Sequence, residues 1–363
     1  MKPDEWDVEA IRSHFVFPQA GRIVTNNAAS TQPPRELLAL LESLAPDYEN
    51  VHRGQSSASQ AMTRRFEDAY DQIARFVNAP GRNNIVVCRN TTEAHNTVMY
   101  SLLTAFRDGD NVVTTMMEHN SNYVPWYAMC KDILPKFGRR VEYRLVRFDP
   151  RSGELDLEHM ASLVDSRTKL VCCTGASNFF GTKTPLAAVR ALADASGYVQ
   201  PDGERRSYLL VDGAQLVPGT FVDVQQLDID YLSFSFHKML APFGVGVLYA
   251  KKHLLESSLP FLYGGDMIAE GQVFPDSVGY NALPWKYESC PTRCEPGAGR
   301  VIPVRNEPGG GLGLAIRRLG GSPPARYVDH RTDGDRHERS AGAHLGAGAS
   351  GAGGNAVAGV PAR

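Results

Sequence analysis

The sequence lacks several features that would assign it to a common class of protein. No stretch of its 363 residues is apolar for long enough to span a membrane, and the acidic N-terminus MKPDEWDVEAIRSHF has no apolar segment of a secretory signal. A strong net charge is also missing, because 38 Lys and Arg residues oppose 40 Asp and Glu residues, which leaves −2. These absences argue against a membrane location and against nucleic acid as a partner.

Cysteine is scarce, with six residues in the chain. Without a secretory signal they are expected to be free thiols in a reducing compartment, so we predict a cytoplasmic protein. Cys172 and Cys173 belong to an apolar strand-like run and are predicted to be buried packing residues. Cys290 and Cys294 have no histidine pair nearby, so no metal site is predicted there.

Lysine and phenylalanine are both absent after residue 289, where 16 glycines and 10 arginines occur. This stretch has no periodicity and cannot bury enough apolar surface to offset its ordering entropy, so a disordered tail is one interpretation. The abrupt change in composition favours a second interpretation, in which the reading frame is shifted. We divide the chain into an N-terminal segment (1–55), a large α/β domain (56–289) and an aberrant Gly/Ala/Arg-rich tail (290–363).

The middle of the chain alternates apolar strand-like runs with helical stretches, without internal repeats. Residues 63–80 have apolar side chains at helical spacing and are predicted to form an amphipathic helix that Pro80 and Gly81 end. The predicted strands are 84–88, 111–115, 141–146, 169–175, 208–212, 231–235 and 244–250. This alternation predicts βαβ units, hence a mostly parallel sheet sandwiched by helices, with ligands beyond the carboxyl ends of the strands.

Polar side chains stand at several of these strand ends. Asp212 ends the run YLLVD; alone it would cap a helix or form a local ion pair. Lys238 lies between two apolar runs; alone it would be a solvated loop lysine, whereas in an apolar pocket its amine could form a Schiff base.

A phosphate site is predicted where a strand runs into a helix at RNTTEAHN. Thr91 and Thr92 stand at the junction, where free backbone N–H groups and the helix dipole favour an anion; an ordinary Thr N-cap is the alternative. Ser235 and His237 could donate to the same phosphate.

Three further residues follow other strands. His119 could stack on a flat ring or fill a gap in the core, while Asn178 and Gln215 offer amides to a ligand hydroxyl. In combination these groups are what pyridoxal 5'-phosphate requires, because a lysine binds its aldehyde and an aspartate keeps its pyridine nitrogen protonated.

The motifs resemble the aminotransferase class V family of fold-type I pyridoxal-phosphate enzymes, and within it the cysteine desulfurase/selenocysteine lyase branch. The similarity runs from about residue 23 to 289. It is carried by NNAASTQPP, NVHRG, RNTTEAHN, GDNVVTTMMEHNSNYVPW, SNFFGTKTPL, VDGAQ, SFHKMLAPFGVGVLY and YGGDMI.

The resemblance implies roles for individual residues. Lys238 would be the catalytic Schiff-base lysine, Asp212 would pair with the pyridinium nitrogen, and His119 would stack on the ring as a second catalytic residue. The cofactor phosphate would be bound by Thr91, Thr92, Ser235 and His237, and the ring hydroxyl would be contacted by Asn178 and Gln215. The substrate side of the site would be formed by Asn27, Ala28, His52 and Arg53.

The chain departs from the family pattern at several points. Ser56 replaces the second histidine of HRG-x-H, and Asn26 stands where an acid is usual. SCPTRC replaces a Gly-Thr-Pro segment that should help bind the partner subunit's phosphate. The small C-terminal domain, with its substrate-binding arginine and persulfide-forming cysteine, has no recognisable counterpart after residue 290 and is lost or out of frame.

The resemblance therefore implies a homodimeric enzyme that acts on a small amino-acid substrate. The first prediction is a cysteine desulfurase, which removes sulfur from cysteine through an external aldimine and passes it to a sulfur acceptor protein. Another reaction of the family, by an aminotransferase, a β-lyase or an epimerase, is the alternative. An inactive, frameshifted family member is the third interpretation.

Overall fold

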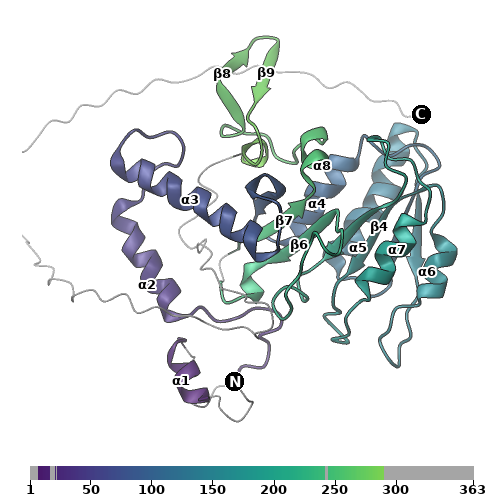
Figure 1. The fold of residues 1–363 in the computed structure, drawn as a ribbon, viewed down its shortest axis with the longest axis horizontal. Coiled ribbons are helices and arrows are strands. Elements are labelled where there is room, and N and C mark those ends of the chain that lie inside the picture. Colours follow the sequence, from purple (N-terminus) through teal and green to yellow (C-terminus); the bar gives the residue numbers. More distant parts are fainter. Residues whose placement is uncertain (1–6, 17–20, 22, 242–243, 290–363) are drawn as a thin grey trace, which may run out of the picture. The chain divides into compact units, whose positions relative to one another are not determined.

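The computed structural model of the protein describes residues 7–16, 21, 23–241 and 244–289 (Figure 1). A seven-stranded sheet has the order β1-β7-β6-β5-β4-β2-β3, and a separate two-stranded sheet pairs β8 with β9. The strands are β1 (Ile85–Cys88), β2 (Asn111–Thr115), β3 (Glu142–Val146), β4 (Thr168–Thr174), β5 (Tyr208–Asp212), β6 (Tyr231–Ser235), β7 (Gly246–Ala250), β8 (Ile268–Phe274) and β9 (Ser277–Tyr280).

Helices connect most of these strands. They are α1 (Val8–Ser13), α2 (Arg35–Leu44), α3 (Ser57–Phe76), α4 (Thr91–Leu102), α5 (Asn120–Ala128), α6 (Leu157–Leu163), α7 (Leu186–Asp194) and α8 (Lys252–Ser257). A π-helical turn, Met129–Ile133, extends α5, and short 3₁₀ turns include Phe236–Lys238 directly after β6 and Trp285–Tyr287.

The predicted mostly parallel sheet is confirmed. β2 to β6 pair in parallel, whereas β7 runs antiparallel to both of its neighbours, β6 and β1. The predicted bounds of β2, β5 and β6 agree with the structure, and the other strands of this sheet differ by one or two residues at an end. The β8–β9 pair was not predicted. Its residues are mostly exposed, so these strands do not need the apolar residues that mark a buried strand in a sequence.

The predicted helix 63–80 is displaced relative to α3. The helix begins six residues earlier because the Ser56 side chain accepts a hydrogen bond from the Ser59 backbone N–H and caps it. It ends at Phe76, before Pro80, with Val77 as its C-cap. The polar first turn of α3 carries no apolar period, which explains why the pattern located the helix only from residue 63 onward.

Helices cover both faces of the large sheet (Figure 1). Side chains of α3, α6 and α7 pack in one core, and those of α4, α5 and α8 in the other. Cys172 and Cys173 of β4 are fully buried on opposite faces, and burial raises the pKa of both thiols well above its usual value. Their predicted packing role is confirmed. Within the described residues, no helix has the length and apolar character needed to cross a membrane.

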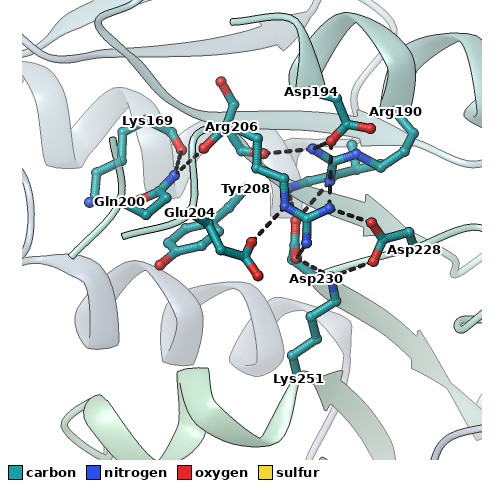
Figure 2. A network of polar contacts seen from close by, with 12 residues as sticks. Lys169, Arg190, Asp194, Gln200, Glu204, Arg206, Tyr208, Asp228, Asp230 and Lys251 are labelled. Carbon is teal, nitrogen blue, oxygen red and sulfur yellow. Dashed lines mark hydrogen bonds and ion pairs between the residues drawn. The ribbon is translucent and has the colours of Figure 1, made fainter. Parts of the chain in front are cut away.

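Ion pairs close the amino-terminal ends of β5 and β6 (Figure 2). Asp230, only 1% exposed, precedes β6 and accepts hydrogen bonds from Leu209 N at 2.8 Å and from Arg190 Nη1 at 2.8 Å. Its other oxygen lies 2.8 Å from Lys251 Nζ. Arg206 joins Glu204, Asp228 and Asp230 to the same network. The buried carboxylate is therefore paired with cations from three segments of the chain.

Replacing Asp230 with asparagine keeps the shape of the side chain but removes the buried anion that Arg190, Arg206 and Lys251 share. The buried Arg190 then keeps only the more exposed Asp194 as an anionic partner. We expect the free energy of unfolding to fall by about 3–5 kcal/mol, the usual cost of breaking a buried ion pair. Urea titration at pH 7 measures this change. Glu256→Gln, which breaks the exposed Lys252–Glu256 pair, serves as the control and should cost at most about 1 kcal/mol. An equal effect of the two substitutions would contradict the structural role of Asp230.

Candidate active site

A cavity of about 460 Å³ opens where β4, β5 and β6 end and α4 and α5 begin. Most of the residues predicted from the sequence line it. They are Ala28, Thr91, Thr92, His119, Asn178, Asp212, Gln215, Ser235, His237 and Lys238. The expectation that polar side chains gather beyond the carboxyl ends of the strands agrees with this geometry.

The start of α4 is fastened to the end of β6. The Thr91 backbone N–H donates to Ser235 Oγ at 2.8 Å, and the two side-chain hydroxyls lie 2.7 Å apart. Gly246 of β7 permits this approach, because a Cβ there would lie 2.5 Å from Asn90 Cα. The helix N-terminus is thus held over the cavity, with Thr92 exposed at its rim.

Asn90, rather than a threonine, caps α4. Its side-chain oxygen accepts from Glu93 N at 3.0 Å, so the alternative interpretation of this junction as a Thr N-cap is wrong. Thr91 and Thr92 are consequently not occupied as caps, and both face the cavity. The N-terminal end of α4 carries the positive end of the helix dipole, which favours an anion there.

Asp212 and Lys238 reach the cavity from neighbouring strands. Asp212 ends β5, is 3% exposed, and accepts a hydrogen bond from Ala214 N at 2.9 Å. Lys238 is half-buried at the end of the turn that follows β6. Burial lowers the pKa of Lys238, and the negative charge of Asp212 opposes that shift. Partial desolvation therefore makes this amine more available as a nucleophile than a surface lysine.

His119 stands at the rim as the N-cap of α5. Its Nδ1 accepts from Ser121 N at 3.1 Å and lies 2.8 Å from the Ser121 hydroxyl, and the side chain is exposed toward the cavity. The alternative of a buried core histidine is therefore wrong. The cap fixes the ring at the helix start, a placement that suits stacking on a planar ligand; the stacking role stays a prediction.

Glu118, the residue before His119, was missed by sequence reasoning. Its carboxyl group accepts hydrogen bonds from Thr115 Oγ1 at 2.5 Å, Asn122 Nδ2 at 2.6 Å and Thr174 N at 2.9 Å. It thereby ties the ends of β2 and β4 to α5. Burial raises the pKa of Glu118 to about 8 despite these donors. An acid three residues after the end of a buried strand and directly before a site histidine was the available signal.

His95 was also missed. This fully buried side chain of α4 donates from Nδ1 to Ser121 O at 2.8 Å, and its Nε2 accepts from Ser233 Oγ at 2.6 Å. Burial lowers the pKa of His95, so the ring is neutral at physiological pH. Ser233 pairs with Asp212 in the sheet register, so His95 links the strands beneath the cavity to the first turn of α5. Only tertiary contacts reveal this role.

Three predicted substrate-side residues lie outside the cavity lining. Asn27 is exposed beside it. Arg53 donates from Nε to Asp266 Oδ1 at 3.2 Å, and His52 Nδ1 lies 3.5 Å from Asp266 Oδ2. His52 also packs against Trp285. These two residues bind the Asp266 side chain within the chain, and their role toward a substrate stays a prediction.

Together, the mostly parallel sheet and the lysine–aspartate cavity at its carboxyl edge define the class of fold-type I pyridoxal-phosphate enzymes. Residues 23–295 match the aminotransferase class-V family, and the chain belongs to that family. The predicted family and fold class are confirmed. The lining residues fit the cofactor: a lysine for its aldehyde, a carboxylate for its ring nitrogen and a helix N-terminus for its phosphate.

Similar proteins support a narrower assignment. A cysteine desulfurase of Haloferax volcanii is 38% identical over 313 residues, which cover 81% of this chain and 69% of that protein. A probable cysteine desulfurase of Halobacterium salinarum is 37% identical over 78% of this chain and 66% of its own length. Among solved structures, the cysteine desulfurase CsdA of Escherichia coli has a TM-score of 0.65 at 30% identity, covering 77% of this chain and 66% of its own. The chain thus spans about two thirds of the length of these relatives.

The raised pKa of Glu118 predicts a pH-dependent stability. An acid whose pKa rises from 4.5 to about 8 on folding destabilises the folded state increasingly as pH increases through this interval, because the unfolded chain ionises first. Glu118→Gln removes this titration. We expect its free energy of unfolding to vary less between pH 5 and about pH 8 than that of the wild type.

Urea titrations at three pH values within this interval measure the difference in slope. Glu42→Gln, at an exposed carboxylate on α2, is the matched control and should keep the wild-type slope. A Glu118→Gln slope equal to that of the wild type would mean that Glu118 is already ionised in the folded protein at pH 5.

Proposed function

We propose that this chain is a pyridoxal-phosphate-dependent cysteine desulfurase. The observation that carries the proposal is the convergence of Lys238 and Asp212 on one cavity beside the N-terminus of α4. The relatives named cysteine desulfurases support the choice of reaction. The chain spans about two thirds of the length of these relatives. Cysteine as the substrate and a protein as the sulfur acceptor are therefore also proposed.

The site residues divide the work of holding the cofactor, which when bound supplies an electron sink for a carbanion. Lys238 would bind its aldehyde and, once released by the substrate amine, move a proton at Nζ. Asp212 would hold a proton at the ring nitrogen, and His119 would lie against the ring. Asn178 and Gln215 would face the ring hydroxyl. The phosphate would be bound by Thr91, Thr92, Ser235 and His237.

Desulfuration also needs a thiolate that attacks the sulfur of cysteine, forming a persulfide and leaving alanine. The cysteines within the described residues, Cys88, Cys130, Cys172 and Cys173, are all buried. Burial raises the pKa of Cys130 to about 12, which disfavours a thiolate. This observation favours, as a second candidate, a family reaction without a protein persulfide, such as amine transfer or β-elimination.

A homodimer and a sulfur acceptor protein are proposed from the family resemblance, and the cytoplasm from the composition. The predicted tail 290–363, with Cys290 and Cys294, lies outside the described residues. The family match ends at residue 295, which supports the proposal that the reading frame shifts near residue 290.

The cofactor assignment predicts a yellow protein. Purified with added pyridoxal phosphate, the full chain should absorb near the wavelength of a lysine–cofactor Schiff base, and borohydride should fix the cofactor on Lys238, identified by peptide mass spectrometry. Lys238→Ala removes the only predicted attachment point, so reduction should then leave no labelled peptide. Lys252→Ala, at an exposed lysine of α8, is the control and should label normally. A folded wild-type chain that never takes up the cofactor would refute the proposal.

The reaction itself separates the two candidates. With cysteine and dithiothreitol, a desulfurase should form alanine and sulfide in equal amounts. A transaminase should instead need a keto acid and release no sulfide, and a β-lyase should form pyruvate and ammonia. Asp212→Asn should lower kcat in any of these reactions by about 10²-fold or more, because the ring nitrogen loses its anionic partner.

A further inference from the structure

The turn that carries Lys238 is held from outside by Thr31, a residue 207 positions earlier in the chain. The Thr31 backbone N–H donates to His237 O at 2.8 Å. Its hydroxyl donates to the same carbonyl at 3.1 Å and accepts from Leu240 N at 2.7 Å. One threonine thus binds the backbone on both sides of Lys238.

The backbone at Leu240 explains why this support matters. Leu240 has φ of 65°, in the left-handed region that a leucine rarely adopts. Such a conformation costs about 1–3 kcal/mol and persists only where surrounding contacts hold it. The Met239 and Ala241 N–H groups bond to Phe236 O at 2.7 and 3.0 Å, within the turn itself. Leu240 N, in contrast, depends on the Thr31 hydroxyl, which comes from a distant segment.

The segment that carries Thr31 is itself fastened to the cavity. Gln215 Nε2, just after β5, donates to Ala28 O at 2.9 Å. Ala28 and Ala29 both line the cavity. Residues 26–31 are therefore connected to the strand end of Asp212 at one point and to the turn of Lys238 at another. Displacement of this segment would reach Lys238 through Thr31.

We propose that Thr31 is a positioning residue, whose hydroxyl holds the His237–Leu240 backbone so that Lys238 Nζ keeps its place in the cavity. The role rests on the proposed function, because Lys238 has a catalytic task only if the cofactor binds. Proton transfer tolerates little displacement: a shift of about 1 Å in a catalytic group can lower a rate by about 10²-fold. Thr31 would accordingly affect turnover more than substrate binding.

Thr31→Val tests this role, because valine keeps the shape and the backbone N–H but loses both hydroxyl bonds. In the cofactor-free full chain we expect the Leu240 amide to exchange its hydrogen about tenfold faster, as loss of one hydrogen bond implies. In the loaded enzyme we expect kcat to fall about tenfold to a hundredfold with KM changed by less than about twofold. Thr31→Ser restores the hydroxyl and should recover both values.

Ser101→Ala is the matched control, since it removes a similar long-range hydroxyl bond, to Leu259 O at 2.7 Å, far from Lys238 in the sequence. It should leave the Leu240 exchange rate and kcat unchanged. If Thr31→Val does not fold, Thr31→Ser and Thr31→Ala provide the same comparison. Wild-type exchange at Leu240 together with wild-type kcat in the hydroxyl-free variants would overturn the proposal.

Failure of the proposed function would look different. A wild-type chain that takes up no cofactor, while Thr31→Val still accelerates exchange at Leu240, would retain the contact and remove its catalytic purpose. Faster exchange without any loss of kcat in an active enzyme would instead overturn the positioning role alone. The exchange measurement thus separates the backbone support from the chemistry.

Discussion

The burial of a carboxylate at the end of a central parallel strand is the constraint on which the rest of the site depends. Asp212 is nearly inaccessible to water, and a buried negative charge is costly unless cations or donors face it. Within the chain it accepts a hydrogen bond from the Ala214 N–H. Its negative charge also opposes the lowering of the pKa of Lys238 by burial. A ligand with a protonated ring nitrogen would satisfy it further.

The two ends of the same strands handle charge differently. At the amino-terminal ends, Asp230 is matched by arginine and lysine side chains, so the network is complete within the chain and serves stability (Figure 2). At the carboxyl ends, the polar groups line a cavity and are supported from behind by neutral or acidic groups. His95 and Glu118 have buried ring or carboxyl groups bonded to several elements, which keeps the rim residues in fixed positions. The stabilising ion pairs and the cavity thus lie at opposite ends of the same strands.

The segment before residue 55 belongs to the site although the sequence separates it from the α/β domain. Residues 26–31 contact both the strand end of Asp212 and the turn of Lys238, whereas His52 and Arg53 bind the Asp266 loop. The predicted boundary at residue 55 therefore separates segments that pack together. A pattern along the chain marks where local structure changes, but it does not tell which segments share a surface.

The sequence by itself determined the seven strands of the large sheet, their mostly parallel pairing and ten of the seventeen residues that line the cavity. Strand periodicity and polar residues at strand ends are local signals, and parallel strands bring their carboxyl ends to one edge whatever the details of packing. Only the tertiary structure decided that Asn90 caps α4, that His95 bonds Ser233, and that Thr31 holds the turn of Lys238. These contacts join distant residues or depend on competition between neighbouring caps, and neither geometry leaves a periodic trace in the sequence.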